Sequence, residues 1–416
     1  MSQQELQRIK VIENAGEGRI TVGKAAELLE LSPREVKRLK RRYQSGDAAW
    51  VYHGNQGKSP VNRISETVRK QVVELAQGRY QGFNDTHLWE KLTQVEGLVL
   101  SRPSVRRILR QAGLASPQKR RAPPYRSRRE RRAQEGMMLQ TDGSTHDWLE
   151  GRGPKLTLLG FIDDATGQVP VAQFQGESED TAGYLRITRQ VVEQKGIPLS
   201  IYRDRHGAFQ RTDAHWTVEE QLAGSQVPTQ LGRCWQELGI TSIAARSPQA
   251  KGRVERLWRT FQDRLVSELR LAAASTVEQA NTVLERFLPE YNRQFARAAS
   301  QPGMAYRKLD ARLDLDYIFA LRYERVVNPD HTIVVGAGLR VQLPELPGHQ
   351  GYAGKKVEIC QQPKGDVKVY LERRLLYSEA AAPGSAPVRA QKMRRAAGPR
   401  KKKPIQVYTY AGRAAI

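Results

Sequence analysis

The chain has few cysteines and no long apolar segment, and these shortages narrow the classes of protein it can belong to. Its 416 residues include only two cysteines, Cys234 and Cys360, which stand far apart and outside any CxxC or Cys/His cluster. We therefore expect reduced thiols and no zinc. No run of about 18 apolar residues exists, and the first residues lack a basic-then-apolar signal pattern. These absences favour a cytoplasmic protein without a membrane-spanning helix.

Acidic residues are also scarce relative to basic ones. Lysine and arginine total 68 against 44 aspartates and glutamates, which leaves a net charge of +24. Such a surplus destabilises a compact fold by self-repulsion and is usually retained because a polyanion neutralises it. Nucleic acid is the first partner to consider and an anionic membrane surface the second. The length predicts several domains.

Residues 20–43 hold two helical patterns separated by a short turn. Ser32 is a suitable N-cap for the second helix, with Pro33 at its first position and Glu35 completing a capping box. The alternative to DNA contact is an αα-hairpin with a solvated basic face. Because the second helix carries charge of one sign, we predict a helix-turn-helix domain over residues 1–60. Its DNA-binding residues would be Arg34, Lys37, Arg38 and Arg41.

A second helical region, residues 61–115, ends in another capped basic helix with Arg106 and Arg107, followed by Gly113. A second DNA-binding domain and an ordinary small helical bundle explain this looser pattern equally well. Residues 116–135 combine prolines with like charges, which indicates a linker that orders along phosphates. Its expected DNA contacts are Arg120, Arg121, Arg128 and Arg129.

From residue 136 the pattern changes to strands. Apolar or alternating strands are expected at 138–141, 155–162, 169–174, 199–203 and 242–245, with helices at 179–195, 231–238 and 251–269. Three antiparallel strands followed by alternating helices and strands predict one mixed α/β catalytic core over residues 136–300. Short strands separated by turn glycines predict a small C-terminal β-barrel over residues 301–380. Residues 381–416 are expected to form a disordered basic tail.

Three carboxylates stand at chemically informative places in this core. Asp142 is expected at the end of the first strand, Asp204 at the end of the neighbouring fourth strand, and Glu255 in the first turns of a long helix. Oxygen ligands of this kind suit Mg²⁺ or Mn²⁺, and two such ions can assist cleavage of a phosphodiester. Taken singly, each could be a turn residue or an ion-pair partner. Asp163 and Asp164 are rival ligands, although their position between two strands favours hairpin-turn roles.

Three segments around these carboxylates, 139–143, 201–207 and 247–261, resemble the catalytic core of the retroviral-integrase and DDE-transposase superfamily. The match is most specific in Ser247-Pro248-Gln249-Ala250-Lys251-Gly252-Arg253-Val254-Glu255-Arg256. The arrangement of domains is similar to insertion-sequence transposases of the ISNCY type. Two departures are the Arg205-His206-Gly207 segment, where many relatives have Asn-Gly, and a polar insertion at 210–229.

The resemblance implies a multidomain fold: helix-turn-helix domains, a ribonuclease H-like core, a small C-terminal β-barrel and a basic tail. It implies a DDE-type transposase in which Asp142, Asp204 and Glu255 bind two Mg²⁺ or Mn²⁺ ions, with Lys251 and Arg259 gripping DNA. The expected partners are terminal inverted repeats, target DNA and further copies of the chain, in the bacterial cytoplasm near the nucleoid. The alternatives are a catalytically inactive DNA-binding regulator and a ribonuclease H-like nuclease that cuts without joining.

Overall fold

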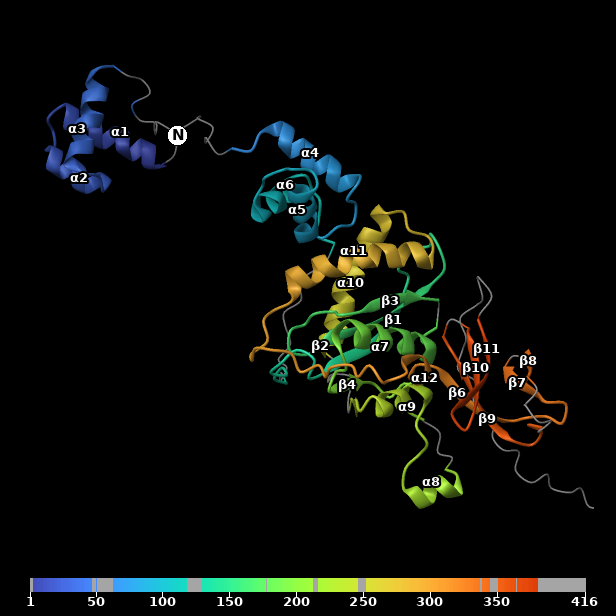
Figure 1. Cartoon of the computed structure of the whole chain (residues 1–416). Coiled ribbons are helices and arrows are strands. Elements are labelled where there is room, and N and C mark those ends of the chain that lie inside the picture. The colour runs from blue at the N-terminus through green and yellow to red at the C-terminus, as the bar shows by residue number, and fades with distance from the viewer. Residues whose placement is uncertain are drawn as a thin grey trace, which may run out of the picture. The chain divides into compact units, whose positions relative to one another are not determined.

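The computed structural model describes residues 3–46, 50, 63–117, 129–176, 178–211, 216–245, 252–336, 339–344, 351–363 and 365–380. The chain divides into two compact units, residues 1–71 and residues 72–416. Their helices and strands are labelled in Figure 1. Among the described residues, no helix is both long and apolar enough to cross a lipid bilayer. The predicted basic tail and most of the predicted linker lie outside the described residues.

Three short helices form the first unit: α1 (Gln3–Gly16), α2 (Val22–Leu29) and α3 (Pro33–Gln44). The two predicted helices correspond to α2 and α3, whereas α1 was not predicted. Ser32 caps α3 as expected, since its hydroxyl accepts a hydrogen bond from the Glu35 backbone N–H at 3.3 Å. Ile12 of α1 is fully buried in the same small core as Val36 of α3. Helix α1 therefore supplies buried side chains to the small core that it shares with α2 and α3.

Helix α4 (Glu66–Gln77) contains the division between the units, and α5 (Asp85–Gln94) and α6 (Arg102–Gln111) follow it in the second unit. Ser101 caps α6 by accepting from the Ser104 backbone N–H at 3.3 Å. Gly113, with a φ of +76°, lies in the left-handed region just past the helix, as expected of a stop signal. The capped helix predicted from the sequence is confirmed.

A five-stranded mixed sheet forms the centre of the second unit. Its strands are β1 (Leu139–His146), β2 (Leu156–Asp163), β3 (Ala172–Gln175), β4 (Ser200–Arg203) and β5 (Thr241–Ala244), in the order β3-β2-β1-β4-β5. β1 to β3 are antiparallel, whereas β4 runs parallel to both β1 and β5. This confirms the predicted mixed α/β core. One correction concerns β1, which continues through a polar half to His146 instead of ending near residue 141.

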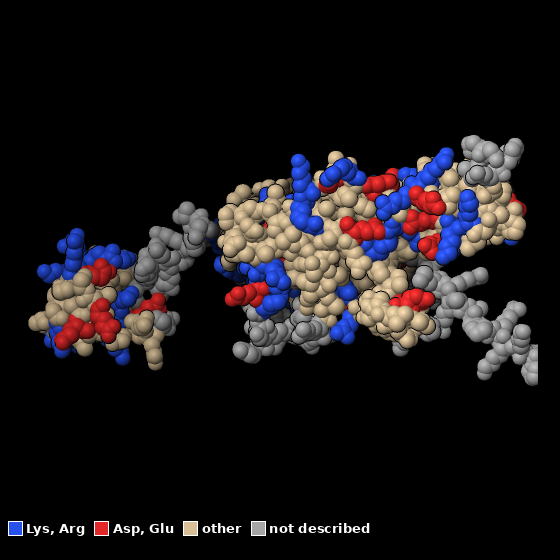
Figure 2. Space-filling view, turned by 60° about the horizontal axis from the view of Figure 1, so that its bottom comes forward, with Lys and Arg blue, Asp and Glu red and all other residues tan. Residues whose placement is uncertain are grey.

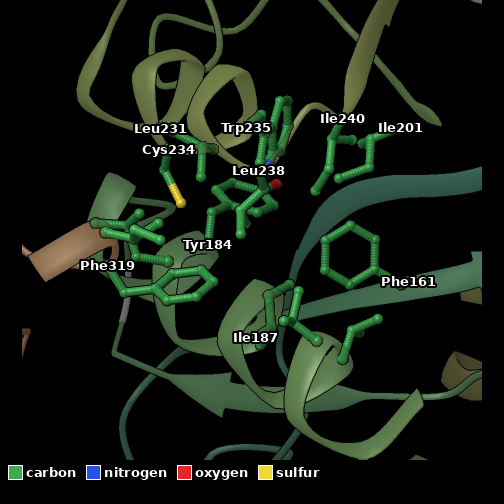
Figure 3. Packing of buried hydrophobic residues seen from close by; sticks show 14 of the residues in the cluster. Phe161, Tyr184, Ile187, Ile201, Leu231, Cys234, Trp235, Leu238, Ile240 and Phe319 are labelled. Atoms are coloured by element: carbon green, nitrogen blue, oxygen red, sulfur yellow. The ribbon is translucent and has the colours of Figure 1, made fainter. Parts of the chain in front are cut away.

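Alternate residues of the central strands face two separate apolar layers. Odd-numbered side chains such as Leu159 and Phe161 pack with α7 (Thr181–Lys195) and α9 (Gln230–Glu237), and Figure 3 shows Phe161, Tyr184 and Trp235 in this layer. Even-numbered side chains such as Leu158 pack with α10 (Gly252–Leu271) and α11 (Val277–Phe295). β2 is buried along its whole length because both faces are covered.

The polar insertion at 210–229 contains a short helix, α8 (Val218–Ala223), among its described residues. Its Thr217 and Glu220 form a complete capping box. Glu220 is buried, and its carboxylate also accepts from the Val227 backbone N–H at 2.8 Å and pairs with Arg211. The buried Glu220 carboxylate therefore joins the residues before and after α8, and Arg211, within the insertion.

The described C-terminal strands form two sheets and no closed barrel, so the predicted small β-barrel is not confirmed. After α12 (Leu315–Ile318), four strands pair in the order β11-β10-β9-β6, and β7 and β8 pair only with each other. The strands are β6 (Leu321–Val326), β7 (Thr332–Gly336), β8 (Leu339–Gln342), β9 (Lys356–Gln361), β10 (Val367–Leu371) and β11 (Arg374–Glu379).

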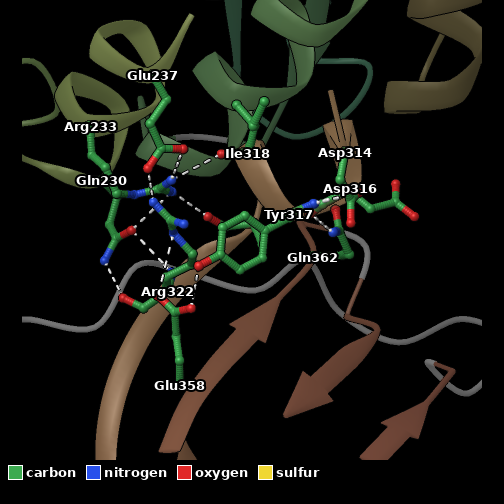
Figure 4. A network of polar contacts seen from close by, with 11 residues as sticks. Gln230, Arg233, Glu237, Asp314, Asp316, Tyr317, Ile318, Arg322, Glu358 and Gln362 are labelled. Atoms are coloured by element: carbon green, nitrogen blue, oxygen red, sulfur yellow. Dashed lines mark hydrogen bonds and ion pairs between the residues drawn. The ribbon is translucent and has the colours of Figure 1, made fainter. Parts of the chain in front are cut away.

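The physical reason for the open sheet lies at the free edge of β6. The Gln230 side chain of α9 donates to the Arg322 backbone carbonyl at 2.6 Å and accepts from the Arg322 backbone N–H at 3.1 Å (Figure 4). One amide thus satisfies the backbone groups that a further strand would need. Arg233 of α9 donates to the Ala320 carbonyl at 2.6 Å beside it. The start of this edge is therefore bonded to a core helix instead of to a further strand.

Candidate active site

Asp142 lies in β1, and Asp204 comes directly after the neighbouring parallel strand β4. β1 pairs with β4 through Leu139 with Ile201 and Gln140 with Tyr202. Continuing this register by two residues brings Asp142 level with Asp204, which directly follows the last residue of β4. Asp142 was expected to end its strand, but it lies inside β1, opposite Gly160 of β2. What ends near Asp142 is the pairing of β1 with β4.

The side chain of Asp142 belongs to the face of the sheet that α10 covers. Two residues before it, Gln140 donates to the Asp164 carboxylate at 2.6 Å, and Arg253 of α10 contacts the same oxygen. Two residues after it, Ser144 accepts from Gln262 of α10 at 3.3 Å. Because successive side chains of a strand alternate between faces, Asp142 points to the same side as its two neighbours.

Glu255 lies in the first turn of α10, as expected, with its side chain exposed. The buried side of this helix includes Val254, Leu257, Trp258, Phe261 and Leu265. One turn after Glu255, the Trp258 ring rests on Gly160, where an added Cβ would lie 3.2 Å from Trp258 Cη2. Since Gly160 is opposite Asp142, the helix passes Asp142 close to the turn that carries Glu255.

Asp142 faces α10, the helix that carries Glu255, but the three carboxylates do not form a closed metal site in this conformation. Within the described residues, no group of three or more histidine, cysteine, aspartate or glutamate side chains could hold a metal ion. The donor chemistry nevertheless fits a hard cation, because Asp142 and Asp204 offer only oxygen ligands and no described thiol lies in an exposed position. The assignment of the triad stays a prediction.

A fourth carboxylate, Glu179, joins this region and was not predicted. Burial raises the pKa of Glu179, and the charges of Asp142 and Asp204 raise it further, while hydrogen bonding from Tyr184 and the charge of His206 lower it. Its carboxylate accepts from the Tyr184 hydroxyl at 2.6 Å and lies 3.5 Å from His206 Nδ1. Glu179 was predicted as the first residue of a helix, but α7 begins at Thr181 with Asp180 as its N-cap, and nothing in the sequence indicated this role for Glu179.

His206 is held beside Asp204 by the local backbone. The Asp204 carboxylate accepts from the His206 backbone N–H at 2.8 Å, which is the geometry of an aspartate-led turn. The ring of His206 then reaches towards Glu179. The Arg205-His206-Gly207 departure noted in the sequence thus connects Asp204 to the unpredicted carboxylate.

Asp163 and Asp164 have structural partners that account for both carboxylates. Asp163 accepts from the Gly136 backbone N–H at 2.9 Å and from the backbone N–H and hydroxyl of Thr166 at 2.8 and 2.9 Å. Asp164 has no exposed side-chain surface and is surrounded by donors from three segments of the chain. The hairpin-turn interpretation is confirmed for Asp163 and incomplete for Asp164.

The predicted DNA-binding residues fall into three groups. Those on α3 and α6, together with Arg259 on α10, are exposed; they are Arg34, Lys37, Arg38, Arg41, Arg106, Arg107 and Arg259. Arg129 is half-exposed and pairs with buried Asp164. Arg120, Arg121, Arg128 and Lys251 lie outside the described residues. On the face drawn in Figure 2, basic side chains are interspersed with acidic ones and do not gather in one patch.

Comparison with known proteins identifies the family. The chain is 37% identical over 370 residues to y4bF of Sinorhizobium fredii, which is named as a transposase, covering 89% of this chain and 79% of the relative. It is 28% identical over 402 residues to the transposase for insertion sequence IS1202 of Streptococcus pneumoniae, covering 88% of this chain and 84% of the relative. No protein-family model matches the chain.

Solved structures give a weaker likeness. The catalytic core domain of HTLV-2 integrase, in complex with magnesium, has a TM-score of 0.26 at 19% identity and covers 37% of this chain and 87% of that chain. The simian T-cell lymphotropic virus intasome in complex with PP2A regulatory subunit B56 gamma has a TM-score of 0.32 at 13% identity, covering 75% and 100%. Scores this low support no conclusion about this chain.

The extent of the match to y4bF decides the class. The chain belongs to the transposases.

Proposed function

We propose that this transposase binds the terminal repeats of its element and carries out cleavage and strand transfer at a site made by Asp142, Asp204 and Glu255. The observation that carries the proposal is the parallel register of β1 and β4, which brings Asp142 level with Asp204. Glu255, in the first turn of α10, is the third member. The core is then of the ribonuclease H-like type, in agreement with its strand order.

The three carboxylates would hold divalent metal, Mg²⁺ or Mn²⁺, which supplies positive charge to the entering and leaving oxygens of a phosphodiester. The chain itself contributes the positions of the ligands. Asp142 lies in β1 and Asp204 directly follows the neighbouring strand β4, so the sheet limits how far the two can separate, which favours a preformed pair. Glu255 belongs to a different element, so the completeness of the site depends on how the first turn of α10 is held.

DNA binding in this proposal falls to exposed arginines and lysines of α3 and α6. Each is the second helix of a capped helical pair, the element that enters the major groove in helix-turn-helix proteins. Two ends of an element must be processed together, so we propose a dimer or larger assembly on DNA.

The test is strand transfer by a labelled DNA end that carries the element's terminal sequence, in Mg²⁺ or Mn²⁺. Asp142→Asn, Asp204→Asn and Glu255→Gln should each abolish joined and cleaved products while leaving end binding intact. Asp310→Asn is the matched control, because Asp310 forms its ion pair with Arg312 at the surface. If all three site variants bind DNA and still cleave, the triad is wrong. If wild type binds the end but neither cleaves nor joins, the chain acts as a regulator.

A further inference from the structure

One buried carboxylate, Asp164, receives donors from three separate segments of the chain. Its oxygens accept from the Gln140 side chain of β1 at 2.6 Å and from the Arg132 backbone N–H at 2.9 Å. They also contact the guanidinium groups of Arg129 and Arg253. An ionised carboxylate has about four acceptor positions, and Asp164 receives four donors, three at Oδ1 and one at Oδ2. A turn residue that only closes a hairpin would need far fewer partners.

These donors stand at a fixed distance in sequence from the proposed catalytic residues. Gln140 precedes Asp142 by two residues and lies on the same face of β1, whereas Arg253 precedes Glu255 by two residues in the first turn of α10. Asp164 therefore bonds at the same time to the strand that carries one ligand and to the turn that carries another.

The first turn of a helix is its least constrained part, since its leading N–H groups have no partner within the helix. In α10, Val254 of this turn is buried, but the side chain of Glu255 is exposed, so its own packing does not fix its orientation. Arg253 removes that freedom, because one arm contacts Asp164 and the other donates to the Arg129 carbonyl at 2.9 Å. A planar guanidinium bonded at two points fixes orientation as well as position.

The end of the predicted linker closes over the same point. Arg131 donates to the Asp164 and Ala165 carbonyls at 3.2 and 3.0 Å, and Arg129 contacts the Asp164 carboxylate. Burial lowers the pKa of Arg253, and the nearby Asp164 carboxylate opposes this effect. Removing either partner would leave a buried charge unpaired: Asp164 on one side, or Arg253 on the other.

We propose that Asp164, acting through Arg253, is the positioning residue that fixes Glu255 relative to Asp142. This inference rests on the proposed function, because holding Glu255 at a fixed distance from Asp142 matters only if Glu255 is a metal ligand. Asp164 itself touches no substrate and binds no metal. Its role is to hold the first turn of α10 against β1 before metal or DNA arrives.

The first experiment needs neither metal nor activity. Amide hydrogen exchange is measured on the full chain, wild type and Asp164→Asn, without divalent cations. An asparagine offers one acceptor oxygen and turns a donor towards the arginines, so residues 256–259 should exchange at least 10-fold faster, while α11 stays unchanged. Equal exchange of residues 256–259 in both proteins overturns the proposal. Asp310→Asn, which breaks an exposed aspartate–arginine pair, should leave both helices unchanged.

The second experiment uses Arg253→Lys in case Asp164→Asn folds poorly. Lysine keeps the charge but cannot bond to Asp164 and to the Arg129 carbonyl in the same planar geometry. A misplacement of about 1 Å can cost roughly 100-fold in rate, so cleavage should fall 10-fold or more. The Mg²⁺ concentration for half-maximal cleavage should also rise, with end binding unchanged within twofold.

Unchanged cleavage and Mg²⁺ dependence in Arg253→Lys would overturn the role of Asp164, provided that Glu255→Gln is inactive. If Glu255→Gln itself still cleaves, the proposed function fails, whatever the exchange rates of residues 256–259 show. The two failures are therefore distinguishable.

Discussion

Gly160→Ala tests whether α10 packs directly on the backbone of the sheet. The added Cβ would lie 3.2 Å from Ala172 Cβ on one side and 3.2 Å from Trp258 Cη2 on the other. Carbon atoms in good contact lie about 3.5–4.0 Å apart, so each neighbour must move by roughly 0.3–0.8 Å. The β3 side resists this movement, because Phe161 N–H donates to the Val171 carbonyl at 3.0 Å. Trp258, and with it the first half of α10, therefore gives way.

The cost can be worked out from two opposing effects. Overpacking a core by one methyl group costs about 1–3 kcal/mol. Replacing a glycine by alanine recovers about 0.4–1 kcal/mol by restricting the unfolded chain. Gly160 is not among the glycines with positive φ, so alanine adds no backbone strain. We expect the free energy of unfolding to fall by about 0.5–2 kcal/mol, measured by urea denaturation of the full chain.

The matched control is Gly176→Ala, where an added Cβ meets no atom within 4 Å. This variant should be neutral or more stable by up to about 1 kcal/mol. In the strand-transfer assay, Gly160→Ala should also slow cleavage, because the helix that shifts carries Glu255. An unfolding free energy equal to or above that of wild type would refute the close packing of Trp258 on Gly160.

Two further predictions concern ion pairs of the second unit. Arg264→Ala leaves Glu90 without the partner it holds at 2.7 Å in a largely buried setting, so the unfolding free energy should fall by about 3–5 kcal/mol in urea; a loss below about 1 kcal/mol would contradict a buried pair. Hydrogen bonds from Arg270, opposed by burial and supported by Arg152, lower the pKa of Glu150 to about 2. The ionised Glu150 therefore stabilises the folded protein fully above its ordinary pKa of 4.5, and this contribution is lost as the pH falls towards 2. The difference in unfolding free energy between wild type and Glu150→Gln should shrink over that interval. A difference independent of pH would show that the folded pKa is unshifted.

Much of the core could be predicted from sequence because local patterns report burial directly. The continuous apolar run of β2 reflects a strand covered on both faces, and the stripe from Val254 to Leu265 reflects a helix covered on one. Caps were equally local: Ser32 and Ser101 each bond to a backbone N–H three residues ahead. Such features need no knowledge of the rest of the chain.

Features that depend on distant partners could not be predicted. Strand β6 carries alternating charges and was not predicted. Whether a further strand can pair with β6 depends on which group meets its free edge. Here that group is Gln230, 92 residues away in sequence from Arg322. Asp164 looked like a turn residue because its four donors come from other elements. Helix α1 was missed for a similar reason, since its few buried positions gain meaning only against α2 and α3.

The approach of Glu179 to the site depends on a side chain that is absent. Odd-numbered residues of β1 face α7, and at position 143 the residue is glycine. A Cβ there would lie 2.6 Å from Glu179 Oε2, closer than a carbon and an oxygen can come without displacement. Glycine at this position therefore lets the Glu179 carboxylate reach β1 next to Asp142, where it accepts from Tyr184 and faces His206; a larger residue would displace it. The Asp-Gly pair that could be taken for a turn signal in the sequence serves both faces of one strand: the aspartate faces α10, and the glycine makes room for Glu179 on the opposite side.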